Sequence, residues 1–208
     1  DLCGHATLAA AFVLKQLAAS GHLPATIAPF WRNSCVTFVS RSGPLMAESS
    51  ADGITLDFPA TPVHLASVQD DLLDSLGVAA SEVVFFGRTA FDLFVHVSSA
   101  AAVRRIAPKM EQLAKYDARG IIVTSSGDTS DHDVISRFFA PAAGVDEDPV
   151  TGSAHCALAW YWAPEFGRAT LFGYQASRRG GHVRMELRGD RVRLTGHAIL
   201  VSCGELLV

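Results

Sequence analysis

The sequence predicts an α+β protein that uses one arrangement twice, with strands packed around a buried helix. Two alanine-rich apolar helices each begin at a glycine-led turn, one at Cys3-Gly4-His5 and the other at Thr151-Gly152-Ser153. Short strand candidates separated by turn residues accompany both helices, and such turns favour hairpins over βαβ crossovers. We therefore expect a duplicated fold that holds one anionic substrate between its halves.

The first half begins with a helix over His5–Ala19, which ends near Gly21. This helix is apolar on all sides for three turns, so we expect it to be enclosed on all sides. Three antiparallel strands are predicted next, and the two prolines of Pro59–Val63 indicate a crossing between domains. The strands are expected at Cys35–Ser40, Leu45–Ser49 and Gly53–Phe58.

The second half is predicted to contain three helices among further strands. The helices are Ser67–Leu76, Ala100–Tyr116 with its register disturbed by Pro108, and Ser153–Ala163 stopped by Pro164. The strands are expected at Glu82–Gly87, Asp92–Ser98, Gly120–Ser125, Val134–Phe139, Val183–Arg188 and Arg191–Thr195. Two further strands are expected in the tail of the chain, at Ala198–Ser202 and Glu205–Val208.

Composition argues against a disordered, a nucleic-acid-binding and a membrane-spanning protein. Of 208 residues, 49% are apolar and 18% charged, which predicts a buried core and not disorder. The net charge of −4 gives no reason to expect a nucleic-acid or acidic-lipid partner. No apolar run approaches the roughly 18 residues that would span a bilayer. The four cysteines form no CxxC pair, so we expect reduced thiols in a cytoplasmic protein.

The two helix starts are the strongest candidates for a binding site. The first N–H groups of a helix lack intrahelical acceptors and lie at the positive end of its dipole, so they bind anions readily. Gly4 and Gly152 allow a ligand to approach the backbone, and Ser153 is suited to cap its helix or to bind a carboxylate oxygen. The alternative is that both glycines only permit tight packing of helix against strand.

Three further side chains are candidates for chemistry. His5 lies at a helix start, where the dipole favours its neutral form, so it is suited to exchange a proton or donate a hydrogen bond. Asp148 could form a turn, cap the helix, bind an amine or assist proton transfer. Cys3 precedes a helix start that lowers a thiol pKa, but Pro149 occupies the matching place in the second motif. A two-thiol racemase mechanism is therefore disfavoured.

Two stretches resemble the signatures of the PhzF-like isomerases, a family named for a phenazine-biosynthesis enzyme. They are Leu2-Cys3-Gly4-His5-Ala6-Thr7-Leu8-Ala9 and Asp146-Glu147-Asp148-Pro149-Val150-Thr151-Gly152-Ser153-Ala154-His155-Cys156, with Ser136–Pro141 and Ser177–Gly181 similar to flanking segments. The resemblance implies a diaminopimelate-epimerase-like fold, two β-barrel-like rolls each around a central helix. The expected domains are 1–62 with 198–208, and 63–197, with the site in the cleft between them.

The resemblance also implies a chemistry. In such enzymes a glutamate moves a proton between carbons as a general acid/base, without cofactor or metal. That glutamate lies in a segment before the Cys-Gly-His motif, and this chain begins almost inside that motif. Without the opening strands the first helix would be partly unwrapped, so we expect that the working protein has these strands or that something else covers this surface.

By motif position, Gly4 and His5 take substrate and proton-handling roles. Asp148, Gly152 and Ser153 take the second substrate-binding side. The resemblance further suggests a homodimer.

The predicted function is thus a cofactor-independent isomerase of a small carboxylate metabolite, with His5 and Asp148 assisting proton transfer and Cys3 beside the bound anion. Two alternatives stay open. One is an amino-acid racemase or epimerase that uses Cys3. The other is a binding or interaction module that lacks the general base.

Overall fold

The computed structural model describes residues 4–31, 34–40 and 43–204, and it divides the chain into two compact units. Unit 1 comprises residues 1–57 and 195–208, and unit 2 comprises residues 58–194. The chain crosses between them after Asp57 and after Leu194, whereas the sequence placed the crossings at 62/63 and 197/198. The fold mixes helices and strands, with a large sheet and few helices.

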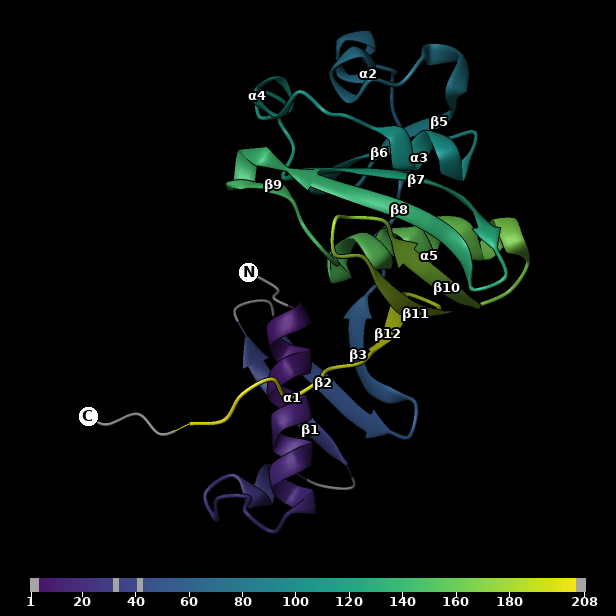
Figure 1. Ribbon diagram of the computed structural model, residues 1–208. Helices are drawn as coiled ribbons and strands as arrows, with labels where there is room; N and C mark the ends of the chain where they lie inside the picture. The colour runs from purple at the N-terminus through teal and green to yellow at the C-terminus, as the bar shows by residue number, and fades with distance from the viewer. Residues whose placement is uncertain (1–3, 32–33, 41–42, 205–208) are drawn as a thin grey trace. The chain divides into compact units, whose positions relative to one another are not determined.

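Unit 1 is built from one long helix and an antiparallel sheet (Figure 1). The helix α1 spans Gly4–Ala19, and a single 3-10 turn, η1, spans Ala28–Phe30. The strands are β1 (Cys35–Ser40), β2 (Gly43–Ser50) and β3 (Gly53–Pro59), paired in that order. The helix and the three strands lie close to their predicted positions, because each is marked by local turn residues, whereas η1 was not predicted.

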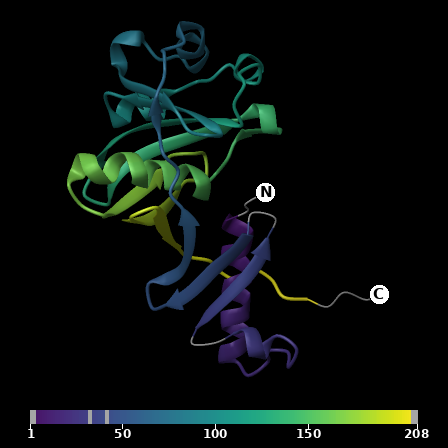
Figure 2. The same cartoon turned by 180° about the vertical axis from the view of Figure 1, so that it is seen from behind.

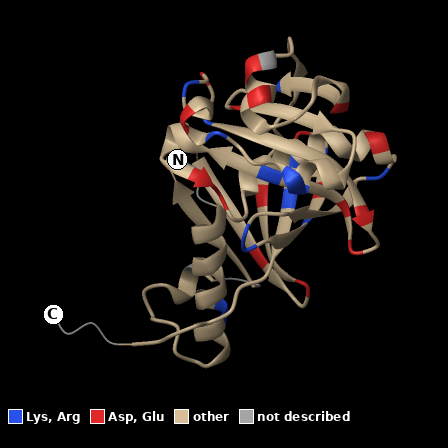
Figure 3. Cartoon of the chain, turned by 45° about the horizontal axis from the view of Figure 1, so that its top comes forward, with Lys and Arg blue, Asp and Glu red and all other residues tan. Residues whose placement is uncertain are grey.

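The expectation that α1 is enclosed on all sides is wrong for this structure. Among its described side chains only Ala11 is buried, and Val13 is 42% exposed. One face of α1 packs against β2, which contributes the buried Leu45 and Ala47. In Figure 3 this helix is almost entirely tan, the colour of residues other than Lys, Arg, Asp and Glu, and its sequence has Lys15 as its one such residue. The apolar surface of α1 is therefore larger than the part of it that the described residues of unit 1 cover.

Unit 2 contains a longer sheet with helices on its faces (Figures 1 and 2). Its strand order is β12-β11-β10-β8-β7-β6-β5-β4, and β9 pairs with β8. The strands are β4 (His64–Leu65), β5 (Val83–Arg88), β6 (Asp92–Val97), β7 (Gly120–Thr129), β8 (His132–Ala140), β9 (Val145–Glu147), β10 (Thr170–Gln175), β11 (Gly181–Arg188) and β12 (Arg191–Gly196). The helices are α2 (Asp70–Leu76), α3 (Ala100–Arg105), α4 (Met110–Leu113) and α5 (Gly152–Phe166), with 3-10 turns η2 (Ala80–Glu82) and η3 (Pro141–Ala143).

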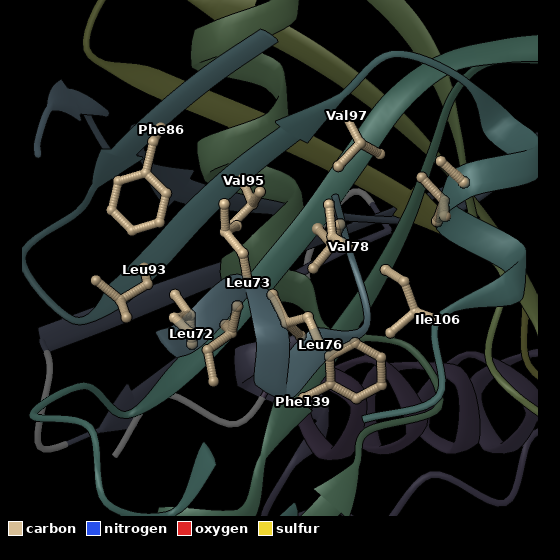
Figure 4. Packing of buried hydrophobic residues seen from close by; sticks show 14 of the residues in the cluster. Leu72, Leu73, Leu76, Val78, Phe86, Leu93, Val95, Val97, Ile106 and Phe139 are labelled. Carbon is tan, nitrogen blue, oxygen red and sulfur yellow. The ribbon is translucent and has the colours of Figure 1, made fainter. Parts of the chain in front are cut away.

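One face of this sheet packs against α2 and α3 through a large apolar cluster. Leu93, Val95 and Val97 alternate along β6 and point into it, as the period of two in a strand requires. Figure 4 shows these side chains meeting Leu72, Leu73 and Leu76 of α2 and Ile106 after α3. The cluster fixes the strands that carry the site described below.

The opposite face of the same strands packs against α5. Phe94, which alternates with the cluster residues of β6, contacts the ring of Tyr161, and the indole of Trp162 donates a hydrogen bond to Thr124 of β7. Most of α5 is buried: Ala154, His155, Cys156, Ala157, Leu158, Ala159, Trp162 and Ala163. Enclosure, predicted for both apolar helices, is therefore found for α5 alone among the described helices.

Two connections correct the expectation of hairpins over crossovers. β6 and β7 are parallel and are joined through α3 and α4, and β8 and β10 are parallel and are joined through α5. Parallel neighbours need such a crossover, so unit 2 contains βαβ units that turn residues alone did not reveal. Strand β10 was not predicted from the sequence.

Three element boundaries also differ from the prediction. The helix expected over Ala100–Tyr116 is broken into α3 and α4, because Ile106 leaves the helical conformation (φ −53°, ψ 125°) two residues before Pro108. Helix α5 runs through Pro164 to a left-handed cap at Gly167 (φ 63°). The strand expected at Ala198–Ser202 is irregular chain, and Glu205–Val208 lies outside the described residues.

Candidate functional site

The start of α5 is shaped by the turn that precedes it. Thr151 is the N-cap residue, with φ −111° and ψ 105°, and its hydroxyl donates a 2.5 Å hydrogen bond to Oδ2 of Asp148. Gly152 and Ser153 form the first helical positions, where N–H groups lack intrahelical acceptors. A partly exposed carboxylate is thus held beside a cluster of backbone donors.

A fully buried amide fixes this turn. The side chain of Gln175, at the end of β10, accepts a hydrogen bond from the Thr151 N–H (2.8 Å) and donates one to the main-chain oxygen of Asp148 (2.6 Å). Its Nε2 also donates to the Thr151 hydroxyl at 3.2 Å. Since a primary amide offers both donors and an acceptor, Gln175 satisfies the backbone of the turn from both sides.

His155 lies one turn further into α5 and is fully buried. Its Nδ1 is 2.7 Å from the main-chain oxygen of Thr151, which can only accept, so Nδ1 carries the proton. Burial lowers the pKa of His155, and the Thr151 carbonyl only partly opposes this. The imidazole is therefore neutral. From its buried position it holds the main chain of Thr151, the N-cap residue of α5, by this hydrogen bond.

A guanidinium reaches the same helix start from Arg119, the residue just before β7. Arg119 donates from Nε to Oδ1 of Asp92 at 2.9 Å and from Nη2 to Oδ2 of Asp92, and Nη2 also donates to Oγ of Ser153 at 3.0 Å. Burial raises the pKa of the Asp92 carboxyl, and the Arg119 guanidinium opposes this rise. The ion pair with Arg119 therefore compensates the buried carboxylate and places a positive charge next to Ser153.

A second ion pair supports the other side of the turn. Arg137 on β8 holds Glu147 of β9 through Nε (2.7 Å) and Nη2 (3.0 Å), and its Nη1 donates to the Ile106 oxygen. Beside this pair is an open hollow of about 690 Å³, lined by Met110, Asp146, Glu147, Pro149, Ser177, Arg178 and Arg179. The Ser177 hydroxyl donates a hydrogen bond to the Pro149 oxygen at 2.8 Å. This bond connects the turn that carries Arg178 and Arg179 with the residues before α5.

The predicted site residues fall into two groups. Asp148, Gly152 and Ser153 come together at the start of α5 in unit 2. Gly4 and His5 form the first turn of α1 in unit 1, where His5 is exposed. Cys3 lies outside the described residues.

Sequence reasoning missed Gln175, Arg119, Asp92 and His155. No local motif marks the first three, since Gln175 lies 24 residues from Thr151 and Arg119 lies 34 residues from Ser153. His155 stands inside the quoted motif and was the one residue that its spacing, one turn after Thr151, could have indicated.

The fold and this helix start define a class of protein, a mixed α/β protein with an acidic turn, a serine and a guanidinium at the start of a buried helix. The family model described as phenazine biosynthesis-like protein (PhzC-PhzF) matches residues 1–204. The chain belongs to this PhzF-like family, as the resemblance of its motifs predicted.

Relatives and solved structures agree with this assignment. An uncharacterized isomerase of Halalkalibacterium halodurans is 41% identical over 209 residues, covering 100% of this chain and 74% of the relative. The human phenazine biosynthesis-like domain-containing protein is 35% identical over 220 residues, covering 99% and 73%. A crystal structure of a PhzF family protein from Enterococcus faecalis has a TM-score of 0.87 at 35% identity, covering 100% of this chain and 74% of that one.

A more distant structure shows the fold alone. A predicted epimerase from Pseudomonas aeruginosa has a TM-score of 0.63 at 19% identity and covers 94% of this chain. The isomerase names among the relatives agree with the predicted class of enzyme. Within the described residues, no helix has the length and apolar character needed to cross a bilayer.

Proposed function

We propose that the protein is an isomerase that moves a proton within a small carboxylate-bearing metabolite by general acid/base catalysis, without cofactor or metal. In this proposal the anion binds at the helix starts, and Asp148 and His5 assist proton transfer. Membership of the PhzF-like family and the isomerase names of its relatives support the reaction class.

The observation that carries the proposal is the hydrogen bonding of the Asp148 carboxylate, which is satisfied at one oxygen only among the described residues. Its Oδ2 accepts the hydrogen bond from Thr151, while Oδ1 has no hydrogen-bond partner among the described residues. Asp148 is also partly exposed. A carboxylate held at one oxygen and open at the other is suited to exchange a proton with a bound substrate or to orient it.

The neighbouring donors support an anionic substrate group. The N–H groups of Gly152 and Ser153 lie at the positive end of the α5 dipole, and the Arg119 guanidinium, which is paired with Asp92, lies beside Ser153. A carboxylate bound there would be stabilised by the N–H groups and the dipole of the helix start.

The remaining parts of the proposal concern unit 1 and the whole protein. Gly4 and Cys3 would bind substrate and His5 would handle a proton, because their motif matches the first signature of the family. We further propose the duplicated diaminopimelate-epimerase-like roll, with domains 1–62 plus 198–208 and 63–197, a homodimer and a cytoplasmic location. The similarity to PhzF family structures supports the roll.

The test is transfer of solvent deuterium into carbon-bound positions of a substrate. The protein purified from its natural source is incubated in D2O with amino acids, α-hydroxy acids and β,γ-unsaturated carboxylic acids, and products are analysed by mass spectrometry and NMR. Asp148→Asn should slow exchange about 10²-fold or more. Asp190→Asn, at an exposed hairpin turn, is the control and should leave it unchanged.

The other outcomes separate the alternatives. Exchange confined to an α-carbon and abolished by Cys3→Ala would establish the racemase. Carboxylate binding without any exchange would establish the binding module. Full exchange in the Asp148→Asn variant would remove Asp148 from the mechanism.

A further inference from the structure

Asp92, Arg119 and Ser153 form a relay of hydrogen bonds that ends at the start of α5. Asp92 is 2% exposed, and both of its carboxylate oxygens accept from Arg119. The Arg119 guanidinium also donates a hydrogen bond to Oγ of Ser153. The relay therefore connects the first residue of β6 with the second residue of α5.

Arg119 is held in one orientation by its surroundings. Its guanidinium carbon lies 5.5 Å from the ring centre of Phe91 and 5.7 Å from that of Phe138, and its main-chain N–H donates to the Phe91 oxygen. A two-point contact with Asp92 fixes the plane of the guanidinium. The donor that faces Ser153 is therefore preorganised and does not depend on a bound ligand.

The chemistry of the three groups fixes the direction of each hydrogen bond. A guanidinium has donors only, so Oγ of Ser153 must accept from Arg119. The single hydroxyl proton of Ser153 then points to another acceptor, and none of the described residues provides one. A hydroxyl that accepts from a cation also becomes a stronger donor, because the hydrogen bonds polarise one another.

We propose that Arg119 is a positioning residue that makes the Ser153 hydroxyl an obligatory donor to the bound ligand. The inference rests on the proposed function, since it takes the start of α5 as the place of the substrate anion. It deepens that function by requiring a hydrogen-bond acceptor, such as a carboxylate oxygen, next to the Ser153 hydroxyl. A neutral amide carries no negative charge for the helix start to stabilise, and an ammonium group has no acceptor for the hydroxyl, so both fit this position poorly.

The experiment measures binding of defined probes at the helix start. Acetate, malonate and benzoate are titrated into the ¹⁵N-labelled full chain, with acetamide, malonamide and benzamide as neutral counterparts. Dissociation constants are taken from the amide shifts of Gly152, Ser153 and Ala154. In the wild type we expect carboxylates to bind about tenfold or more tightly than the amides.

The variants form a double-mutant cycle. Ser153→Ala and Arg119→Lys should each weaken carboxylate binding about tenfold, and the double variant should be no weaker than the weaker single variant, because both remove the same donor. Lysine keeps the charge and lacks the planar fork, so Arg119→Lys separates orientation from electrostatics. Ser153→Thr should retain binding, since it keeps the hydroxyl.

Arg104→Lys is the matched control. Arg104 also contacts an aspartate at two points, Asp128, but it lies away from α5 on α3 and should leave binding unchanged. If Arg119→Lys does not fold, the Asp92→Asn/Arg119→Gln pair removes both charges together and replaces it in the cycle.

The results test the role of Arg119 and the existence of the anion site separately. Losses that multiply in the double variant, or an Arg119→Lys variant that binds like the wild type, would show that Arg119 does not act through Ser153, while the proposed function stands. If no carboxylate shifts the Gly152–Ala154 amides of the wild type, the anion site itself fails, and the inference fails with it.

Discussion

The side-chain amide of Gln175 donates a 2.6 Å hydrogen bond to the main-chain oxygen of Asp148, although the two residues are 27 positions apart. The amide is fully buried, and the carbonyl it satisfies belongs to the turn that positions the proposed acid/base. The geometry of the candidate site therefore depends on β10, an element outside the signature motif.

Gln175→Leu should destabilise the protein by about 2–4 kcal/mol, because it leaves the Thr151 N–H and the Asp148 carbonyl without their partner in a buried place. Urea unfolding followed by circular dichroism measures the loss. Gln16→Leu, an exposed substitution on α1, should change stability by less than about 0.5 kcal/mol. Equal stability of wild type and Gln175→Leu would show that these hydrogen bonds contribute nothing net.

Stability should fall as the pH drops below 6.5. Burial lowers the folded-state pKa of His155, and of His96 and His132, below the usual value of 6.5. The unfolded chain then binds protons that the folded chain refuses, so this stability is present above pH 6.5 and is lost below it. Unfolding free energies measured between pH 5 and 8 check the slope.

The contribution of His155 to the pH dependence of the unfolding free energy can be measured with a substitution. His155→Gln should flatten the decrease below pH 6.5, since glutamine does not titrate. A His155→Gln protein with an unchanged slope would mean that His155 takes up a proton as readily in the folded as in the unfolded chain.

Arg137→Met should cost about 3 kcal/mol, because it strands the Glu147 carboxylate in a site where the two side chains are 13% and 18% exposed. Replacing both with methionine should restore part of the loss, since no uncompensated charge then remains. The comparison pair is Arg104 and Asp128, at 39% and 47% exposure, where removing the arginine should cost 1 kcal/mol or less. Thermal unfolding of the wild type and the three variants ranks these effects.

Gly181→Ala should disturb the turn before α5. A Cβ at this position would lie 2.4 Å from Cγ2 of Val150, so the valine must move, at a cost of about 1–3 kcal/mol. The double variant Gly181→Ala/Val150→Ala removes the clashing methyl group and should recover most of the stability. Failure of this rescue would locate the strain in the backbone of β11 and not in its contact with Val150.

The sequence alone determined the elements whose signals are local. The helix starts at Gly4 and Gly152, the strands β1 to β3 and the hairpin between β11 and β12 follow from periodicity, glycines and prolines within a few residues. The two signature stretches also identified the family, because a motif such as Asp148–Ser153 is read from contiguous residues.

Only the tertiary structure decided which distant groups meet and which faces are covered. Two apolar helices of similar composition differ in burial, since α5 packs against β8, β10 and β11 while α1 packs mainly against β2 in the described chain. Gln175 and Arg119 reach the start of α5 because parallel pairing brings β10 beside β8 and β7 beside β6. Hydrogen bonds between residues 24 to 34 positions apart depend on this pairing, which no local pattern encodes.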